Sequence, residues 1–230
     1  MTSFTLDPFP VHFDLEQLQK SLRIKEGSGW VKNLRRLAEE AQAVGKPKAF
    51  YKIAFIGSKT DEQVVIDGVK LTSRVLRVNL DSVHRVFPYV VTCGLELEDW
   101  SNSKSDFLEK YWADVIKEKA LHAAVQNLHQ HLTERYNLGK ISRMNPGSLA
   151  DWPLEEQRPL FAILGEGPGS IGIRLTDHFL MFPVKSVSGI FFPTEISFES
   201  CQLCPREGCS GRRAPYDREL FNQKYHKNSV

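Results

Sequence analysis

The sequence predicts an α+β protein, with a twisted antiparallel β-sheet, flanking helices, one long central helix and a short cysteine-rich tail. Residues 105–137 carry apolar side chains at helical spacing, which together form one wide stripe. Short stretches of aromatic and β-branched residues, separated by turn residues, are typical of antiparallel strands. Three of the four cysteines fall within residues 201–209, beyond the last expected strand. We therefore expect one domain over residues 1–199 and a metal-binding tail over residues 200–230.

The composition is that of an ordinary globular protein. Its 230 residues are 41% hydrophobic and 25% charged, and the formal net charge is only +2. Because the charge is nearly balanced, we expect no strong attraction to nucleic acid or to a membrane surface. The N-terminal segment lacks the apolar core of a signal peptide, and no stretch approaches the ~20 apolar residues that span a bilayer. These features predict a cytoplasmic protein with no membrane or nucleic-acid partner.

The first half of the chain predicts helices followed by strands. In chain order we expect two helices, a strand, a hairpin and a buried strand, over residues 14–23, 30–45, 48–57, 64–71 and 86–92. Asp14 has the side chain of a helix N-cap, and Gly45 with Pro47 beyond it is a common helix end. Asp67-Gly68 is the strongest hairpin signal in the sequence, because tight hairpin turns need positive φ at their two central positions and the Asp-Gly pair is favoured there.

The second half begins with the long helix, which we expect to end at Gly139. Its histidines are interpreted as part of a solvated polar face, because no glutamate or cysteine completes a metal-ligand set. Asp151 is expected to cap a helix over residues 154–164, and the glycine-rich residues 165–169 are expected to form a turn. Short strands are expected at residues 171–175, 179–182 and 188–192.

The tail carries Cys201, Cys204 and Cys209, in a C-x2-C-x4-C pattern. Thiolates this close in sequence are typical ligands of one soft metal centre, so the pattern predicts either zinc or an iron–sulfur cluster. Both kinds of site normally need a fourth ligand: Cys93 or a histidine such as His226 for zinc, and Cys93 alone for an iron–sulfur cluster. In a reducing compartment, metal ligation is more expected than disulfide formation.

Two segments resemble a known family. They are residues 141–148 (ISRMNPGS) and residues 173–189 (IRLTDHFLMFPVKSVSG). These segments resemble the reactivation domain of vitamin B12-dependent methionine synthase, in which an R-x-x-P-G-Y loop binds S-adenosylmethionine and an L-T-x-S-x-x-M-x-P-x-x-S-V-S-G stretch lies nearby. The resemblance covers about residues 50–195 and implies that residues 1–199 are a methionine synthase activation-like domain.

The resemblance implies a binding site for S-adenosylmethionine at these segments. Candidate ligand-binding residues are Arg143, Asn145, Pro146, Gly147, Ser188, Gly189 and Phe191. The planar guanidinium of Arg143 can bind the methionine carboxylate through two hydrogen bonds, and Phe191 can stack on the ligand. The alternative is that Arg143 is an ordinary surface arginine before a Pro-Gly turn.

Two positions depart from the family pattern. Ser148 stands where the family loop has tyrosine, and Gln126 takes the place of a glutamate that helps to bind the ligand. The loss of a carboxylate beside a sulfonium cation would weaken binding by about 1–3 kcal/mol.

The resemblance further implies a stand-alone protein that supports the reductive methylation, and so the reactivation, of a corrinoid methyltransferase. The chain lacks the D-x-H-x-x-G motif, so cobalamin would come only through a partner, a cobalamin-dependent methyltransferase acting in trans. An iron–sulfur cluster in the tail could then deliver the required electron. The alternative is a non-catalytic subunit of such a methyltransferase, with zinc or iron–sulfur bound in the tail and a degenerate S-adenosylmethionine pocket.

Overall fold

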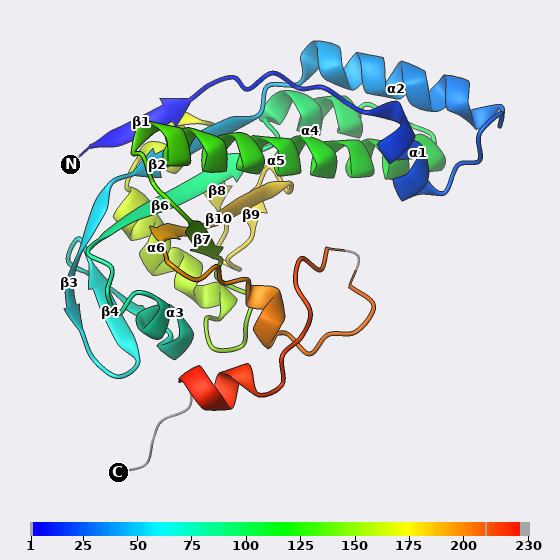
Figure 1. The fold of residues 1–230 in the computed structure, drawn as a ribbon. Coiled ribbons are helices and arrows are strands. Elements are labelled where there is room, and N and C mark those ends of the chain that lie inside the picture. The colour runs from blue at the N-terminus through cyan, green and yellow to red at the C-terminus, as the bar shows by residue number, and fades with distance from the viewer. Residues whose placement is uncertain (1, 210, 226–230) are drawn as a thin grey trace.

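The fold is built on one main antiparallel sheet with helices on both faces (Figure 1). The computed structural model describes residues 2–209 and 211–225. Within them, eight strands form the main sheet: β1 (Ser3–Leu6), β2 (Lys48–Lys52), β3 (Ala54–Lys59), β4 (Gln63–Ile66), β5 (Val69–Thr72), β6 (Arg85–Thr92), β7 (Ile141–Met144) and β10 (Ser186–Pro193). Strands β8 (Arg174–Leu175) and β9 (Met181–Phe182) pair separately.

Helices fill most of the remaining described chain. They are α1 (Leu15–Leu22), α2 (Trp30–Val44), α3 (Arg74–Asn79), α4 (Leu95–Asn102), α5 (Phe107–Arg135), α6 (Gln157–Leu164) and α7 (Gly167–Ser170). Three further single turns are η1 (Leu154–Glu156), η2 (Ser200–Leu203) and η3 (Phe221–Tyr225). Among the described residues, no helix combines the length and apolar character needed to cross a membrane.

Strand β6 is the centre of the sheet. One edge pairs with β2 and then β3, while the other edge pairs with β10, which in turn pairs with β7. The β7–β10 register sets Phe191 opposite Arg143, and the β6–β10 register sets Gly189 opposite Tyr89. Three segments that are far apart in sequence are thereby brought side by side.

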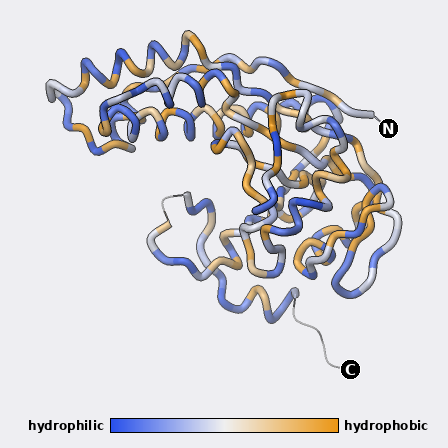
Figure 2. The backbone as a smooth tube through the Cα atoms, turned by 180° about the vertical axis from the view of Figure 1, so that it is seen from behind, coloured by the Kyte–Doolittle hydropathy of each residue, from blue (hydrophilic) through white to orange (hydrophobic). Residues whose placement is uncertain are grey.

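The two faces of the sheet bury two separate cores. Phe87 and Val91 of β6 point toward α1, α2 and α5, whereas Val90 and the β10 residue Ile190 point toward α3 and α6. This alternation follows from the two-residue period of a strand. Hydrophobic and hydrophilic residues likewise alternate around the coil of α2, as Figure 2 shows, because only one side of that helix faces the core.

Several predicted elements are confirmed. The Asp14 carboxylate accepts the backbone N–H groups of Glu16 (2.9 Å) and Gln17 (3.2 Å), as expected of an N-cap. Asp67 and Gly68 both have positive φ (46° and 82°) in the turn between β4 and β5. The long helix is α5, which begins after the N-cap Asp106 and ends at Arg135.

Other predictions are wrong in detail. The strand expected over residues 48–57 is two strands, β2 and β3, which pair with different parts of β6. Asp151 does not cap the helix that follows it. Its carboxylate instead accepts the Ser73 hydroxyl and the Val75 N–H (2.9 Å), and so stabilises the start of α3. The glycine-rich residues expected to form a turn contain the short helix α7, and the strand expected at residues 171–175 is reduced to β8.

Besides α7 and the single turns η2 and η3, the sequence analysis did not predict β1, α3, α4 or β7. Strands β1 and β7 and helices α3 and α4 are each eight residues or shorter, so each offers only one or two periods of the apolar pattern.

Candidate functional site

A cavity of about 430 Å³ lies between α5, the loop that follows β7, and β10. Its wall contains five of the seven predicted ligand-binding residues: Arg143, Asn145, Pro146, Gly147 and Ser188. Apolar side chains from α5 and β9, including Leu121 and Met181, complete the wall. The volume is within the range of about 300–1,000 Å³ that is usual for small-molecule sites.

The loop after β7 is a tight turn held against the sheet. Gly147 has a φ of +82°, which favours glycine, and its N–H donates to the Trp152 carbonyl oxygen (2.8 Å). The Asn145 side-chain amide donates to the Tyr89 hydroxyl and to the Ser188 carbonyl oxygen, both at 2.7 Å. Asn145 therefore fixes the loop to β6 and β10, in addition to lining the cavity.

Gly189 allows this close approach. A Cβ atom at this position would lie 2.4 Å from the Asn145 amide nitrogen and 2.4 Å from the Met144 carbonyl oxygen. Gly189 is buried and is not among the residues that line the cavity. Its contribution to the site is the room that it leaves for the loop.

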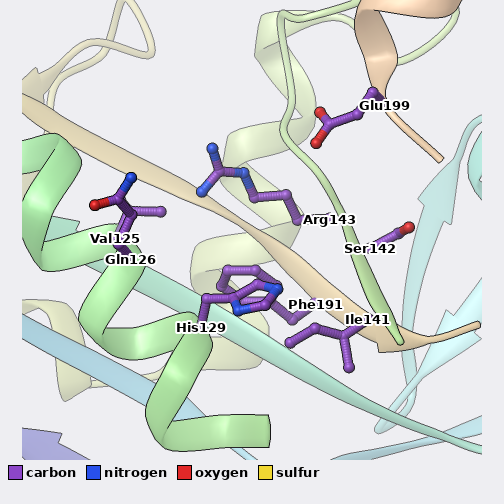
Figure 3. Close-up of a pocket in the computed structure, with 8 residues that line it drawn as sticks. All are labelled: Val125, Gln126, His129, Ile141, Ser142, Arg143, Phe191 and Glu199. Atoms are coloured by element: carbon purple, nitrogen blue, oxygen red, sulfur yellow. The ribbon is translucent and has the colours of Figure 1, made fainter. Parts of the chain in front are cut away.

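A smaller hollow of about 280 Å³ adjoins the first cavity, with which it shares Arg143 and Val125 (Figure 3). Gln126 and His129 of α5 line one side, and Glu199 lies on the segment that leads into the tail. The two cavities are thus neighbouring parts of one surface depression around Arg143.

Phe191 lies beneath Arg143 in this hollow. Its ring is fully buried, packs at a tilt of 31° against Tyr89 (4.5 Å between centroids) and lies 6.0 Å from the Arg143 guanidinium carbon. Among the described residues, no hydrogen-bond acceptor or carboxylate is paired with the Arg143 guanidinium. Arg143 therefore presents an unpaired fork of donors at a half-buried position, supported from below by an aromatic ring.

Two histidines of α5 face the same region. Partial burial is the largest cause that lowers the pKa of His122 and of His129, and the positive charge of Arg143 lowers both pKa values further. Both side chains lie on an exposed side of α5, as the interpretation of a polar face requires, but they also wall the two cavities. A lowered pKa keeps these imidazoles neutral near pH 7.

The tail cysteines lie near this depression. Cys201 and Cys204 are half-buried and Cys209 is exposed. The Arg212 guanidinium donates to the carbonyl oxygens of Cys201 and Cys204, both at 3.1 Å, and so closes the loop that carries the thiols. Among residues 2–209 and 211–225, no three histidine, cysteine or carboxylate side chains are grouped to hold a metal ion. In the observed arrangement the cysteines do not form the predicted metal site.

Cys93 and His226 were the candidates for a fourth metal ligand. Cys93 is fully buried in the core beside α5, and burial is the largest cause that raises the pKa of its thiol to about 12. The structure does not bring Cys93 into a ligand group with the tail cysteines. His226 lies outside the described residues.

Two further charged residues complete the depression. Arg213 lines the larger cavity, Glu199 lines the smaller one, and the Arg213 Nε donates to a Glu199 carboxylate oxygen at 2.8 Å. The sequence analysis assigned neither residue to the ligand site. No periodicity links them to Arg143, and their approach depends on the path of the tail.

Comparisons with known proteins inform the fold. No protein-family model matches the sequence, and no curated protein matches it. The chain is similar to the solved structure entitled "Crystal Structure of the MetH Reactivation Domain bound to AdoHcy", with a TM-score of 0.60 and 16% sequence identity. The similarity covers 87% of this chain and 81% of that chain. This chain has the reactivation-domain fold. The predicted α+β class and the resemblance inferred from the two segments are thereby confirmed at the level of the fold.

The reactivation-domain fold explains how the two segments of the resemblance come together. The first segment forms β7 and its loop, and the second ends in β10, which pairs with β7. Both departures from the family pattern lie in the depression, with Ser148 in the larger cavity and Gln126 in the smaller one.

Proposed function

We propose that this chain binds S-adenosylmethionine in the depression around Arg143 and supports the methylation that reactivates a corrinoid methyltransferase. The observation that supports this most directly is the unpaired Arg143 guanidinium in a cavity of about 430 Å³. A buried or half-buried guanidinium fork is well suited to a carboxylate, which it binds through two parallel hydrogen bonds. The protein in the similar structure is bound to AdoHcy, the product that remains when S-adenosylmethionine has lost its methyl group.

Each part of the depression suits a part of this ligand. Arg143 would bind the carboxylate, and the Gly147 turn would let the backbone approach the ribose. Leu121, Val187 and Met181 provide apolar surface for the adenine and the thioether. When bound, the ligand supplies a sulfonium methyl group for transfer to the cobalt of a corrinoid carried by another protein. The contribution of this chain would be to hold and orient the methyl donor.

The tail metal remains a prediction from the cysteine spacing. For zinc or an iron–sulfur cluster to bind, the three sulfur atoms would have to come together from their present positions and a fourth ligand would be needed. We therefore assign no electron-transfer step to the tail. Anaerobic purification followed by metal analysis, absorbance and EPR spectroscopy tests the prediction, and a colourless protein without iron would contradict the electron delivery predicted from the sequence.

Isothermal titration with S-adenosylmethionine and with S-adenosylhomocysteine tests the ligand proposal. We expect saturable binding of both. If neither ligand produces binding heat at millimolar concentration, the ligand proposal is contradicted. Reactivation is tested by adding the protein to an oxidised cobalamin-dependent methyltransferase with S-adenosylmethionine and a low-potential reductant, and by measuring recovery of methyl transfer.

A second candidate is a non-catalytic subunit of the same methyltransferase. The positions of Ser148 and Gln126 favour it, because both departures remove ligand contacts from the depression itself. This candidate predicts association with the methyltransferase without binding of S-adenosylmethionine. Size-exclusion chromatography of the mixture, with and without ligand, separates it from the first candidate.

A further inference from the structure

The tail places a second arginine in the cavity. Arg213 lines the cavity of about 430 Å³ together with Arg143, although the two residues are 70 positions apart in the sequence. Arg143 reaches it from strand β7, which pairs with β10 at one edge of the main sheet, and Arg213 reaches it from the loop that carries the cysteines. The wall is therefore completed by a segment outside the stretch that resembles the methionine synthase domain.

Hydrogen bonds join Arg212 and Arg213 to the segment that carries Cys201 and Cys204. The Arg213 N–H donates to the Cys201 sulfur at 3.4 Å. The neighbouring Arg212 guanidinium donates to the Cys201 and Cys204 carbonyl oxygens, which joins both ends of the loop. Arg213 is thus held next to the cavity by the cysteine-bearing loop.

The Arg213 side chain keeps donors available. Within the part of the chain that the structure describes, its only hydrogen bond runs from Nε to Glu199, at 2.8 Å. A guanidinium has five N–H donors, so the two terminal nitrogens are unused. Both members of this ion pair are more than one-third exposed, and such pairs contribute little to stability. An incoming anion can therefore bind Arg213 at small cost.

The charges of the cavity favour an anion. Arg143 and Arg213 line it, and none of the described residues in its wall is an aspartate or a glutamate. The positive charges of both arginines also lower the pKa of His122, which lines the same cavity. Glu199 already offsets part of the Arg213 charge, and a further negative group in the cavity would be attracted by both guanidinium groups.

We propose that Arg213 is a second carboxylate-binding residue of this cavity, so that the amino-acid end of the ligand is bound by both Arg143 and Arg213. This inference rests on the proposed function, and it makes the cysteine-bearing loop part of the ligand site. The ligand carboxylate has four lone-pair positions and can accept hydrogen bonds from two guanidinium groups.

The experiment compares Arg213→Gln with Arg218→Gln. Arg218 is an exposed arginine of the same tail that does not line the cavity, so the matched variant removes an equal charge. Each variant is titrated with S-adenosylhomocysteine and with 5′-methylthioadenosine, which has the same nucleoside and thioether but no carboxylate. We expect Arg213→Gln to lower the affinity for S-adenosylhomocysteine at least tenfold. Its affinity for 5′-methylthioadenosine should stay within twofold of wild type. We expect Arg218→Gln to change neither.

The possible failures are distinguishable. If wild type binds S-adenosylhomocysteine and Arg213→Gln binds it equally well, this inference is overturned while the proposed function stands. An equal loss of affinity for both ligands would show that Arg213 shapes the cavity without binding the carboxylate, and this result would also overturn the inference. If wild type binds neither ligand, both the proposed function and this inference fail. Because Arg213 is exposed, we expect the variant to fold, and thermal unfolding checks this.

Discussion

Arg143 is the residue whose chemistry the whole site depends on. Replacement by glutamine removes the charged fork, and a hydrogen bond to a charged group contributes about 1.5–3 kcal/mol, so we expect affinity for S-adenosylmethionine to fall by about 10–100-fold. Arg143→Lys keeps the charge but not the paired donor geometry, so its affinity should lie between those of wild type and Arg143→Gln. Titration calorimetry measures the change, with Arg206→Gln as the control because that side chain is exposed and outside both cavities. Equal affinities for wild type and Arg143→Gln would contradict the assignment.

Gly189 offers a test of how tightly the loop must lie against β10. In Gly189→Ala the new methyl group would meet the Met144 carbonyl oxygen at 2.4 Å, and overpacking of this kind costs about 1–3 kcal/mol. We expect a lower free energy of unfolding in urea together with weaker ligand binding, because Asn145 must move. Gly57→Ala is the matched strand control, since its added Cβ meets nothing closer than 3.9 Å. Equal destabilisation by both changes would refute the close-approach argument.

At the scale of elements, α5 serves both the core and the depression. Its apolar side, which includes Trp112, Ile116 and Leu128, is buried against the sheet, while His122, Gln126 and His129 wall the two cavities. A helix of 29 residues can do both because its faces are independent. The periodic apolar stripe predicted the first face correctly.

The histidines of α5 give the protein a defined pH dependence. Burial is the first cause of the lowered pKa of His122, His129 and His131. The unfolded state therefore binds protons more readily than the folded state, so stability is complete above about pH 6.5 and falls as the pH drops through the lowered pKa values. We expect the free energy of unfolding to decline between pH 7 and pH 5, and His129→Gln to make that decline shallower. The exposed His12→Gln serves as the control, and identical slopes for both variants would refute the prediction.

Strand β7 shows why part of the site was difficult to predict. It has only four residues, and its partner β10 begins more than 40 positions later. Only this pairing sets Arg143 over Phe191, which was expected to stack on the ligand and is instead fully buried beneath the guanidinium. A local sequence pattern carries no information about such a distant partner.

At the scale of the whole molecule, the last described residue of the tail, Tyr225, is anchored to the core of the domain. Tyr225 is fully buried, its hydroxyl donates to the Asn79 side-chain oxygen at 2.8 Å, and its ring packs against Phe198. The tail therefore crosses the molecule from the cysteine loop to α3 (Figure 1).

Tyr225→Ala tests this anchoring. The loss of a large buried aromatic side chain costs about 3–5 kcal/mol, so we expect a clear drop in the urea midpoint and faster proteolysis within residues 200–225. Tyr216→Ala, in the same tail but 45% exposed, should change the midpoint little. If both variants have the same urea midpoint, Tyr225 does not anchor the tail.

The sequence by itself determined the features that depend on neighbouring residues. The stripe of α5, the Asp67-Gly68 turn, the Asp14 cap and the Pro146-Gly147 bend each follow from side chains within a few positions, so local patterns were sufficient to predict them. The resemblance carried by two short segments likewise identified the fold. Only the tertiary structure decided that Arg213 and Glu199 line the cavities around Arg143, that Asp151 stabilises α3, and that Cys93 is buried apart from the tail cysteines. These outcomes depend on which face of the sheet each distant segment packs against. The packing of each segment depends in turn on how the whole chain buries its apolar residues in the two cores.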